Sequence, residues 1–379
     1  LDLAAMKRET EIVGYPILPL VKQLAAACSG DAGGYVHWGA TTQDIMDTAV
    51  VLQLRAAFGL IEADLNEILA SLESLARRYR DAPMAGRTHL QHALPVTFGY
   101  KAAVWRAPLA RQRERLAQLR PRVLMGQFGG AAGTLASLGS DGLAVRAALM
   151  RELDLGEPDI TWHVARDTLA EAVLFTGLLT GSLAKIASDV MMMMSTEFGE
   201  VFEPFEHGRG ASSTMPQKRN PISSELILAC AKLVRQHCAL MLDAMVQDFE
   251  RATGPWHAEW IALPESYIAT AGALRQARLM LAGLNVDTAR MQRNLDLTSG
   301  LIVTEAVMMG LAPKLGRQQA HDVVYDACRA AAESGRPLLD LLASNAEVSP
   351  HMSRTELERL LDPRNYLGSA AQMVDRSLS

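Results

Sequence analysis

The sequence predicts an all-α protein, and three of its properties support that prediction. Long stretches are rich in Ala, Leu, Arg and Glu, which are strong helix formers. Aromatic residues make up only 5% of the chain, and the strand-like alternation of apolar and polar residues is scarce. Hydrophobic residues make up 49% of the 379 residues, which indicates a folded chain with a large core.

Apolar periodicity places the helices in chain order. They are expected near residues 43–80, 94–121, 140–153, 164–198, 220–250, 264–295, 299–312, 316–333 and 354–361. Asp44 and Asp47 suit the positive N-terminal end of the first helix. The fourth is the most apolar, but Lys185 and Asp189 lie within it, so we expect a buried core helix rather than a membrane span. The methionines at 191–194 indicate packing in the core or between subunits.

Gly and Pro punctuation divides the chain into three parts. Residues 1–86 end just after an Asp-Ala-Pro break, residues 87–295 hold the long helices, and residues 296–379 hold shorter helices interrupted by Gly and Pro. The formal net charge is −5 and there is no basic run, which disfavours binding to nucleic acid or to an anionic membrane. The four cysteines form no CxxC motif, so we expect reduced thiols in a cytoplasmic protein.

The most informative segment is residues 210–221, GASSTMPQKRNP, which place hydroxyls, a Lys, an Arg and an Asn between a glycine and two prolines. Gly208 and Gly210 permit unusual backbone angles, and Pro216 and Pro221 favour a loop between the flanking helices. A hydroxyl beside a cation suits an anionic substrate that gains or loses a proton. The segment therefore predicts a catalytic loop held by rigid helices.

This segment resembles the signature of the fumarase/aspartase superfamily, G-S-S-x-M-P-x-K-x-N-P, with Ala211 in place of the first glycine. Residues 37–44, HWGATTQD, resemble a second block of that family, H-x-G-x-T-S-x-D, with Thr42 in place of Ser. Residues 87–95, RTHLQHALP, resemble a third, T-H-x-Q-x-A-x-P. The resemblance spans the whole chain. Members of the family usually carry a further stretch before this point, so we expect that Leu1 is not the native start.

The resemblance implies a three-part all-α fold with a long central helix bundle, assembled as a homotetramer whose active sites each draw on three subunits. It implies that Ser213 is the proton-transfer group and that His89 acts in acid catalysis or in substrate binding. Because a serine hydroxyl is a poor base, its alkoxide would need stabilisation by Lys218 and the loop amides. The implied substrate-binding residues are His37, Thr41, Thr42, Thr88, Gln91, His92, Ser212, Met215, Lys218, Asn220 and His257. Capping of a helix by Thr41 or Thr42 with Asp44 is compatible with that role.

No cofactor is implied, and two patterns that superficially suggest one are weak. His89 and His92 have a spacing that could bind a metal, but no third ligand accompanies them, so no metal is expected. Residues 126–133, GQFGGAAG, resemble a dinucleotide loop, but no hydrophobic strand precedes them. We expect a flexible interhelical turn close to ligand.

Residues 250–265 bear on the choice of substrate. Adenylosuccinate lyases have E-R-D-x-x-x-S-S-x-E-R-x-x-L-P-D here, and their Ser and Arg residues help to hold a phosphate. This chain has Trp256, His257 and Trp260 at those positions, which disfavours adenylosuccinate. The strings GPWHAEW, FGGAAGTL and DPRNYLG instead resemble bacterial 3-carboxy-cis,cis-muconate cycloisomerases.

Two enzymatic functions therefore stay open, both on a small polycarboxylate substrate. One is lactone formation by addition of a carboxylate across a C=C bond. The other is a fumarate-releasing C–N or C–O lyase, which His89 favours because such lyases carry His there, whereas the cycloisomerases often do not. A purely structural, crystallin-type role is disfavoured because Ser213, Lys218 and His89 are all present.

Overall fold

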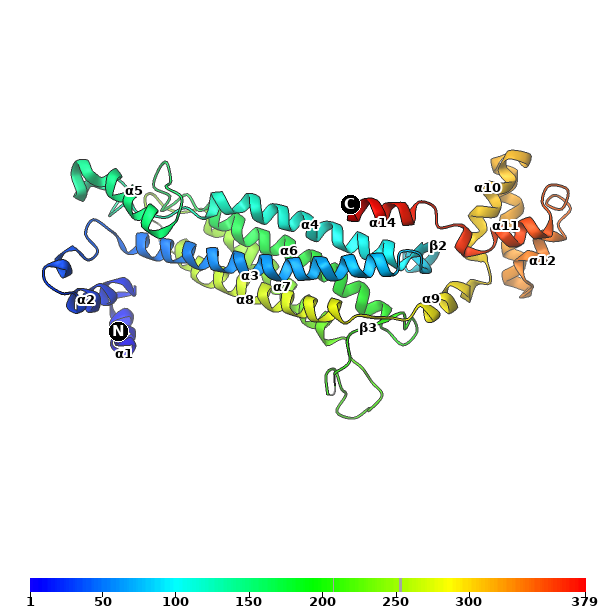
Figure 1. Cartoon of the computed structure of the whole chain (residues 1–379), viewed down its shortest axis with the longest axis horizontal. Coiled ribbons are helices and arrows are strands. Elements are labelled where there is room, and N and C mark those ends of the chain that lie inside the picture. The colour runs from blue at the N-terminus through cyan, green and yellow to red at the C-terminus, as the bar shows by residue number, and fades with distance from the viewer. Residues whose placement is uncertain (207, 252–253) are drawn as a thin grey trace. The chain divides into compact units, whose positions relative to one another are not determined.

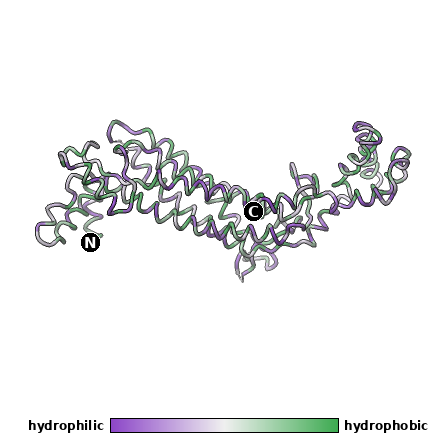
Figure 2. The backbone as a smooth tube through the Cα atoms, turned by 45° about the horizontal axis from the view of Figure 1, so that its top comes forward, coloured by the Kyte–Doolittle hydropathy of each residue, from purple (hydrophilic) through white to green (hydrophobic). Residues whose placement is uncertain are grey.

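The computed structural model describes residues 1–206, 208–251 and 254–379. The fold is mostly helical, which confirms the predicted class (Figure 1). The longest helices are α3 (Thr42–Arg78), α4 (Phe98–Val123), α6 (Asp167–Met193), α7 (Ile222–Ala244) and α8 (Pro255–Ala282). Hydrophobic and hydrophilic positions alternate along them, as expected of helices that bury one face (Figure 2).

Shorter helices occur in three places along the chain. Before α3 lie α1 (Leu3–Val13) and α2 (Ile17–Ala27), and between α4 and α6 lies α5 (Gly142–Leu153). After α8 come α9 (Thr288–Leu295), α10 (Thr304–Leu315), α11 (Arg317–Ser334), α12 (Leu338–Ala343), α13 (Arg354–Leu360) and α14 (Ala370–Leu378). Short 3₁₀ segments cover Ala32–Tyr35, Ala136–Asp141 (interrupted at Gly139), Asp296–Thr298, Leu301–Val303 and Pro363–Asn365.

Short strands, which the sequence did not indicate, form two antiparallel pairs. In the first, β1 (Pro83–Thr88) pairs with β2 (Gln91–Thr97), with an irregularity between Ala85 and Arg87. In the second, β3 (Val201–Phe202) pairs with β4 (Asn285–Val286). The helix predicted from residue 94 begins only at Phe98, because β2 occupies the residues before it and the Thr97 hydroxyl accepts the Tyr100 N–H at 3.0 Å as a helix cap.

Another boundary was also predicted wrongly. The single helix expected over 264–295 is two helices, α8 and α9, separated by Gly283 and strand β4. Pro264 lies inside α8 and not at its start, and the helix tolerates the one backbone donor that a proline removes. A side chain at Gly283 would meet Pro204 at 2.7 Å, so the close approach of another segment requires glycine there.

The chain forms two compact units. Unit 1 comprises Leu1–Leu65, Arg111–Leu183 and Ile227–Arg275, and unit 2 comprises Asn66–Ala110, Ala184–Leu226 and Gln276–Ser379. Each long helix contributes residues to both units. The three-part division at residues 86 and 295 stays a prediction.

Each unit has its own buried residues. In unit 1, fully buried side chains come from all three segments and include Phe58, Leu65, Leu116, Val173 and Val234. In unit 2, α10 packs on α11, and a cluster within α10–α13 buries Val307, Leu311, Leu342, Val348 and Leu357 (Figure 1). At about 25 cal/mol per Å² of buried apolar surface, such clusters dominate the stability of a helical fold.

Helix α6 is long and apolar enough to cross a membrane, but 61% of its most apolar window is buried inside the protein. Its Asp189 carboxylate accepts hydrogen bonds from the Trp105 indole N–H at 2.7 Å and from Lys185. A paired charge and a largely buried surface are typical of a core helix, as predicted.

Candidate active site

The start of α3 in unit 1 holds a buried carboxylate. Asp44 Oδ2 accepts the Thr41 N–H at 2.9 Å, which is the acidic half of a capping box. The Thr41 hydroxyl accepts a hydrogen bond from the Arg251 guanidinium at 3.0 Å, and among the described residues no N–H of the first turn donates to it. The predicted cap therefore exists, but the carboxylate of Asp44 makes it rather than a threonine hydroxyl. Thr42 is the first residue of α3.

Asp44 also accepts hydrogen bonds from segments distant in sequence. The N–H groups of Gly129 and Gly130 donate to its two oxygens at 2.9 Å, and His163 Nε2 lies 2.6 Å from Oδ1. Burial would raise the pKa of Asp44, but the hydrogen bonds from His163, Thr41 and Gly130 outweigh it, so the pKa is lowered. Asp44 is therefore an ionised internal anion that ties the glycine run to α3.

His37 lies near this carboxylate in a left-handed backbone conformation, with φ of 66°. Burial lowers the pKa of His37, although Asp44 acts in the opposite direction. His37 lines a mostly apolar cavity of about 450 Å³ together with Tyr35, Trp38 and Phe128. The imidazole therefore lies in an apolar hollow that favours its neutral form.

His257, in the first turn of α8, is enclosed by aromatic rings. Its ring centroid lies 4.4 Å from that of Trp260, 5.8 Å from that of Tyr15 and 5.9 Å from that of Trp256. Trp256, His257 and Trp260 stand where adenylosuccinate lyases have the serines and arginine of a phosphate site. Aromatic rings at these positions offer no donor set for a phosphate comparable to an arginine. That adenylosuccinate is not the substrate stays a prediction.

In unit 2, the second sequence block forms the β1–β2 hairpin. Thr88 and Gln91 face each other in the last pair, and His89 and Leu90 form the turn with φ of 50° and 64°. Thr88, His89 and Gln91 are all exposed at this tip. The hairpin thus brings together three of the predicted site residues and presents them to solvent.

Behind the tip, Arg87 anchors the hairpin. Its guanidinium donates to both oxygens of the fully buried Glu200, at 3.0 and 2.7 Å, and lies 4.6 Å from the centre of the Phe198 ring. Asn294 donates to the same carboxylate at 2.8 Å. His92 pairs with Arg87 across the hairpin; burial lowers the pKa of His92, Arg87 lowers it further, and Glu200 opposes them. The half-buried His92 imidazole next to the Arg87–Glu200 ion pair therefore favours its neutral form.

The signature loop follows β3 in unit 2. Gly210 has φ of 67°, its carbonyl accepts the Asn220 N–H at 3.0 Å, and a side chain there would lie 2.7 Å from the Asn220 carbonyl oxygen. Residues 210 and 220, at the two ends of the loop, approach each other so closely that position 210 requires glycine. Within the loop, the Ser212 hydroxyl accepts N–H bonds from Thr214 and Met215, whereas Ser213 is exposed. Ser212 thus shapes the turn that presents Ser213.

A carboxylate fastens the base of this loop. Glu203, buried just after β3, accepts the N–H groups of Ser223 and Ser224 at 3.0 and 2.9 Å and the Ser224 hydroxyl at 2.7 Å. These groups are at the N-terminus of α7, where free backbone donors and the helix dipole favour an acid. The hydrogen bonds of Glu203 therefore hold the segment that enters the loop against the N-terminus of α7, which follows the loop.

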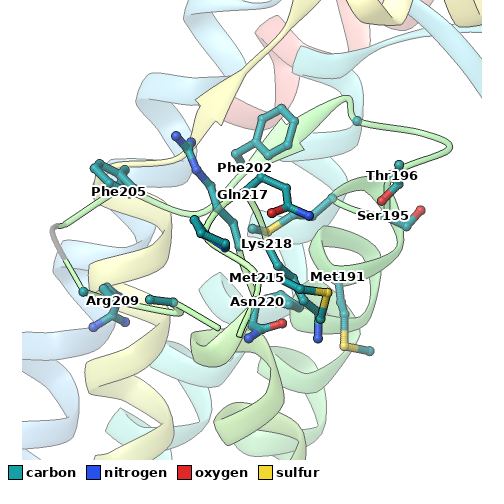
Figure 3. Close-up of a pocket in the computed structure, with 17 residues that line it drawn as sticks. Met191, Ser195, Thr196, Phe202, Phe205, Arg209, Met215, Gln217, Lys218 and Asn220 are labelled. Carbon is teal, nitrogen blue, oxygen red and sulfur yellow. The ribbon is translucent and has the colours of Figure 1, made fainter. Parts of the chain in front are cut away.

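The loop borders a cavity of about 1320 Å³ (Figure 3). Its lining includes Met215, Lys218 and Asn220 from the predicted site, and Arg209 and Arg219 supply two further cations. Of the residues that the structure describes, no Asp or Glu lines it. Such a cavity suits an anionic ligand. Ser212 and Ser213 belong to the same loop but not to the lining.

The predicted site residues thus fall into two sets. Unit 1 holds His37, Thr41, Thr42 and His257, and unit 2 holds Thr88, His89, Gln91, His92, Ser212, Ser213, Met215, Lys218 and Asn220. No sequence pattern indicated His163, Glu200 and Glu203, which support the site residues through contacts distant in sequence. Within residues 1–206, 208–251 and 254–379, no group of three or more His, Cys, Asp or Glu side chains could hold a metal ion.

Comparison with known proteins adds two family matches. A family model described as Lyase matches residues 5–235, and one described as Adenylosuccinate lyase C-terminus matches residues 300–377. Among curated relatives, trans-aconitate decarboxylase 1 of Mycosarcoma maydis is 52% identical, over 100% of this chain and 77% of that protein. The 3-carboxy-cis,cis-muconate cycloisomerase of Pseudomonas aeruginosa is 49% identical, over 100% and 83%. A solved structure of a fumarate lyase from Mesorhizobium sp. BNC1 matches with a TM-score of 0.94 and 55% identity, over 100% of this chain and 86% of that one.

Proposed function

Because the chain belongs to the fumarate lyase superfamily, we propose that it is a cycloisomerase that closes 3-carboxy-cis,cis-muconate to its carboxymuconolactone. The observation that carries this proposal is the cavity beside the signature loop, which presents Lys218, Arg209 and Arg219 without a lining acid among the described residues. A substrate with three carboxylates needs such a field, since the chain itself has a net charge of −5. The identity to cycloisomerases supports the choice of substrate.

The reaction adds one carboxylate oxygen of the substrate across a C=C bond. A C–O bond forms at one carbon, and the neighbouring carbon, which lies next to another carboxylate, takes up a proton. No atom other than that proton is gained, and the ring closure converts one carboxylate into a lactone. Run backwards, the step is an α-proton removal with loss of a β-carboxylate, so one proton-transfer group serves both directions.

We assign that proton to Ser213 and the substrate carboxylates to Lys218, Asn220, Thr88, Gln91 and His257. The exposed position of Ser213 on its loop leaves its hydroxyl free to meet a substrate. The charge that develops on the carboxylate next to the reacting carbon is stabilised by Lys218 as a fixed cation. Arg219 has a different contact, since its guanidinium lies 4.5 Å from the centre of the Phe205 ring.

A second candidate is a fumarate-releasing C–N or C–O lyase. His89 at the exposed hairpin tip favours it, and so does the 55% identity to a structure titled fumarate lyase. Decarboxylation of trans-aconitate belongs in the same test, because a relative at 52% identity carries that name and trans-aconitate is also an unsaturated tricarboxylate.

One assay separates these reactions. Purified protein is incubated with 3-carboxy-cis,cis-muconate and the conjugated-diene absorbance is followed, with the lactone identified by NMR. Parallel samples contain trans-aconitate, with CO₂ measured, and amino- and hydroxysuccinate adducts, with fumarate measured. Loss of the diene with lactone formation supports the cycloisomerase, and its persistence beside release of fumarate or CO₂ overturns it. We expect Ser213→Ala to reduce kcat at least ~100-fold, and full turnover in this variant would refute the role of Ser213.

We further propose that the enzyme is a homotetramer whose active sites combine residues from several copies. Ser213→Ala and His257→Gln variants are each expected to be impaired, and their residues belong to units 2 and 1. If a site takes these residues from different copies, co-refolding equal amounts of the two variants restores up to about a quarter of wild-type activity, because that share of sites draws both intact residues. A mixture as inactive as its components contradicts shared sites.

A further inference from the structure

Three aromatic residues of unit 1 form what we call the aromatic clamp: Tyr15, Trp256 and Trp260. Each lies within 6 Å, centroid to centroid, of the His257 ring, and the rings also contact one another. Trp256 and Trp260 meet edge to face at 5.0 Å, and Tyr15 stacks on Trp256 at 6.0 Å. Such contacts are directional, so the positions of the three rings restrict how the imidazole can turn.

Among the residues that the structure describes, the clamp has one polar anchor. The Trp256 indole N–H donates to Asp47 Oδ1 at 3.3 Å. Asp47 accepts two further hydrogen bonds, at 2.8 and 2.9 Å, from Arg166, which is nearly fully buried. Arg166 also donates at 2.9 Å to Glu259, two residues after His257 in the same helix. The ring next to His257 is therefore tied to a buried ionic group that also holds the helix carrying His257.

The composition of this ionic group makes the indole bond important. Arg166 donates to both carboxylates, and each carboxylate has one further donor: the Trp256 N–H at Asp47 Oδ1, and Gln247, which reaches Glu259 at 3.2 Å. Loss of a donor from a buried acceptor lowers the stability of the fold, whereas at the surface water replaces the lost hydrogen bond. Burial raises the pKa of Glu259, and Arg166 only partly offsets this. The Trp260 N–H differs, because it is buried without a hydrogen-bond partner among the described residues.

We propose that Trp256 is a positioning residue: its indole N–H, held by Asp47, fixes the aromatic clamp and thereby orients the His257 imidazole toward the substrate. The proposal rests on the proposed function, since it assumes that His257 binds a substrate carboxylate. The two tryptophans of the clamp offer a matched comparison. One has an anchored N–H and the other does not, although both rings contact His257.

The test compares Trp256→Phe with Trp260→Phe in the full chain. Histidine labelled with ¹³C at Cε1 gives one NMR signal for each of the nine histidines, and loss of a signal in His257→Gln assigns that residue. In Trp256→Phe we expect the His257 signal to split or broaden as the ring samples several orientations, while in Trp260→Phe it stays single and sharp. A changed chemical shift alone does not count, because either substitution alters the ring currents.

Kinetics provide the second readout. We expect Trp256→Phe to raise KM about tenfold, which corresponds to one misdirected charge-assisted hydrogen bond, and to change kcat much less. Trp260→Phe keeps an aromatic ring beside His257 and has no anchored N–H to lose, so it should raise KM less than Trp256→Phe does. A sharp His257 signal together with an unchanged KM in Trp256→Phe would overturn the proposal. A broadened signal in both variants would also overturn it, since the anchor would then be irrelevant.

Two further outcomes have defined meanings. If Trp256→Phe does not fold, benzothienylalanine at position 256 replaces only the N–H by sulfur and keeps the ring, and the same NMR criterion applies to it. If His257→Gln turns over substrate normally, the substrate-binding role of His257 fails, and with it the functional part of the proposal. In that case a broadened His257 signal in Trp256→Phe would still establish the anchor of the clamp.

Discussion

Asp44 offers a direct test of the internal anion in unit 1. Its Oδ1 accepts hydrogen bonds from Gly129 and His163, and its Oδ2 accepts them from Thr41 and Gly130, while the side chain is fully buried. Asp44→Asn replaces one of these oxygens by an NH₂ group. At the Oδ1 position this group can donate to His163 Nε2 in the other imidazole tautomer, but the Gly129 N–H loses its acceptor. With about 1–3 kcal/mol for an unsatisfied buried group, the expected loss of stability is about 2 kcal/mol.

The assay is equilibrium urea unfolding followed by far-UV circular dichroism, at equal protein concentration for all variants. Asp159→Asn is the matched control, because it makes the same chemical change at an exposed position of unit 1. We expect the control to stay within about 0.5 kcal/mol of the wild type. A loss below about 1 kcal/mol in Asp44→Asn would refute the network, since an unsatisfied buried N–H costs at least about that much.

The pH dependence gives an independent check. The folded protein lowers the pKa of Asp44 below the ordinary value of 3.8. The unfolded chain therefore binds a proton at a higher pH than the folded one, so the stabilisation is fully present above pH 3.8 and is lost as pH falls through the folded pKa. The difference in unfolding free energy between wild type and Asp44→Asn should be constant near neutrality and should narrow in acid. A difference that does not change with pH would show that Asp44 is not ionised.

Three further predictions concern Lys218, Glu203 and Glu259. Lys218→Met should raise KM at least about tenfold in the diene assay, with the fold unchanged by circular dichroism, because it removes a cation from the cavity lining. Glu203→Gln should speed tryptic cleavage at Lys218 or Arg219 about fivefold, measured by mass spectrometry, because it weakens the closure of the loop on α7. Glu259 has a raised pKa, so the folded state holds its proton to higher pH and this group's contribution to stability declines as pH rises above the ordinary value of 4.5. Urea unfolding of Glu259→Gln should lack that decline.

The long helices and the cap at Asp44 could be predicted because their signals are local: helix formers, apolar periodicity and an acid in the first turn. The β1–β2 hairpin could not. Its turn residues, His89 and Leu90, adopt left-handed conformations. Two-residue turns of this kind usually contain Asn-Gly or Asp-Gly, and this sequence has neither at the turn. The apolar residues that follow, up to Thr97, gave a helical pattern that the strand pairing overrides.

The supporting contacts of the site were not predictable for a different reason. His163 lies 119 residues from Asp44, and Glu200 lies 113 residues from Arg87. No spacing rule connects such pairs, because tertiary folding alone brings them together. The residues that the sequence did identify, such as Lys218 and Asn220, belong to one continuous loop whose composition is itself the signal.

The glycine run at 126–133 shows how such a contact changes the meaning of a motif. In a dinucleotide-binding loop, glycine amides hold a phosphate, but here the amides of Gly129 and Gly130 already hold the Asp44 carboxylate. The backbone at Gly130 has φ of 75°, and a side chain there would lie 2.9 Å from the Gly39 carbonyl oxygen. The glycines are thus required for an internal anion rather than for a ligand phosphate. Because that anion also holds the Thr41 N–H, any side chain at position 130 should loosen the start of α3 and with it the predicted substrate contacts at Thr41 and Thr42.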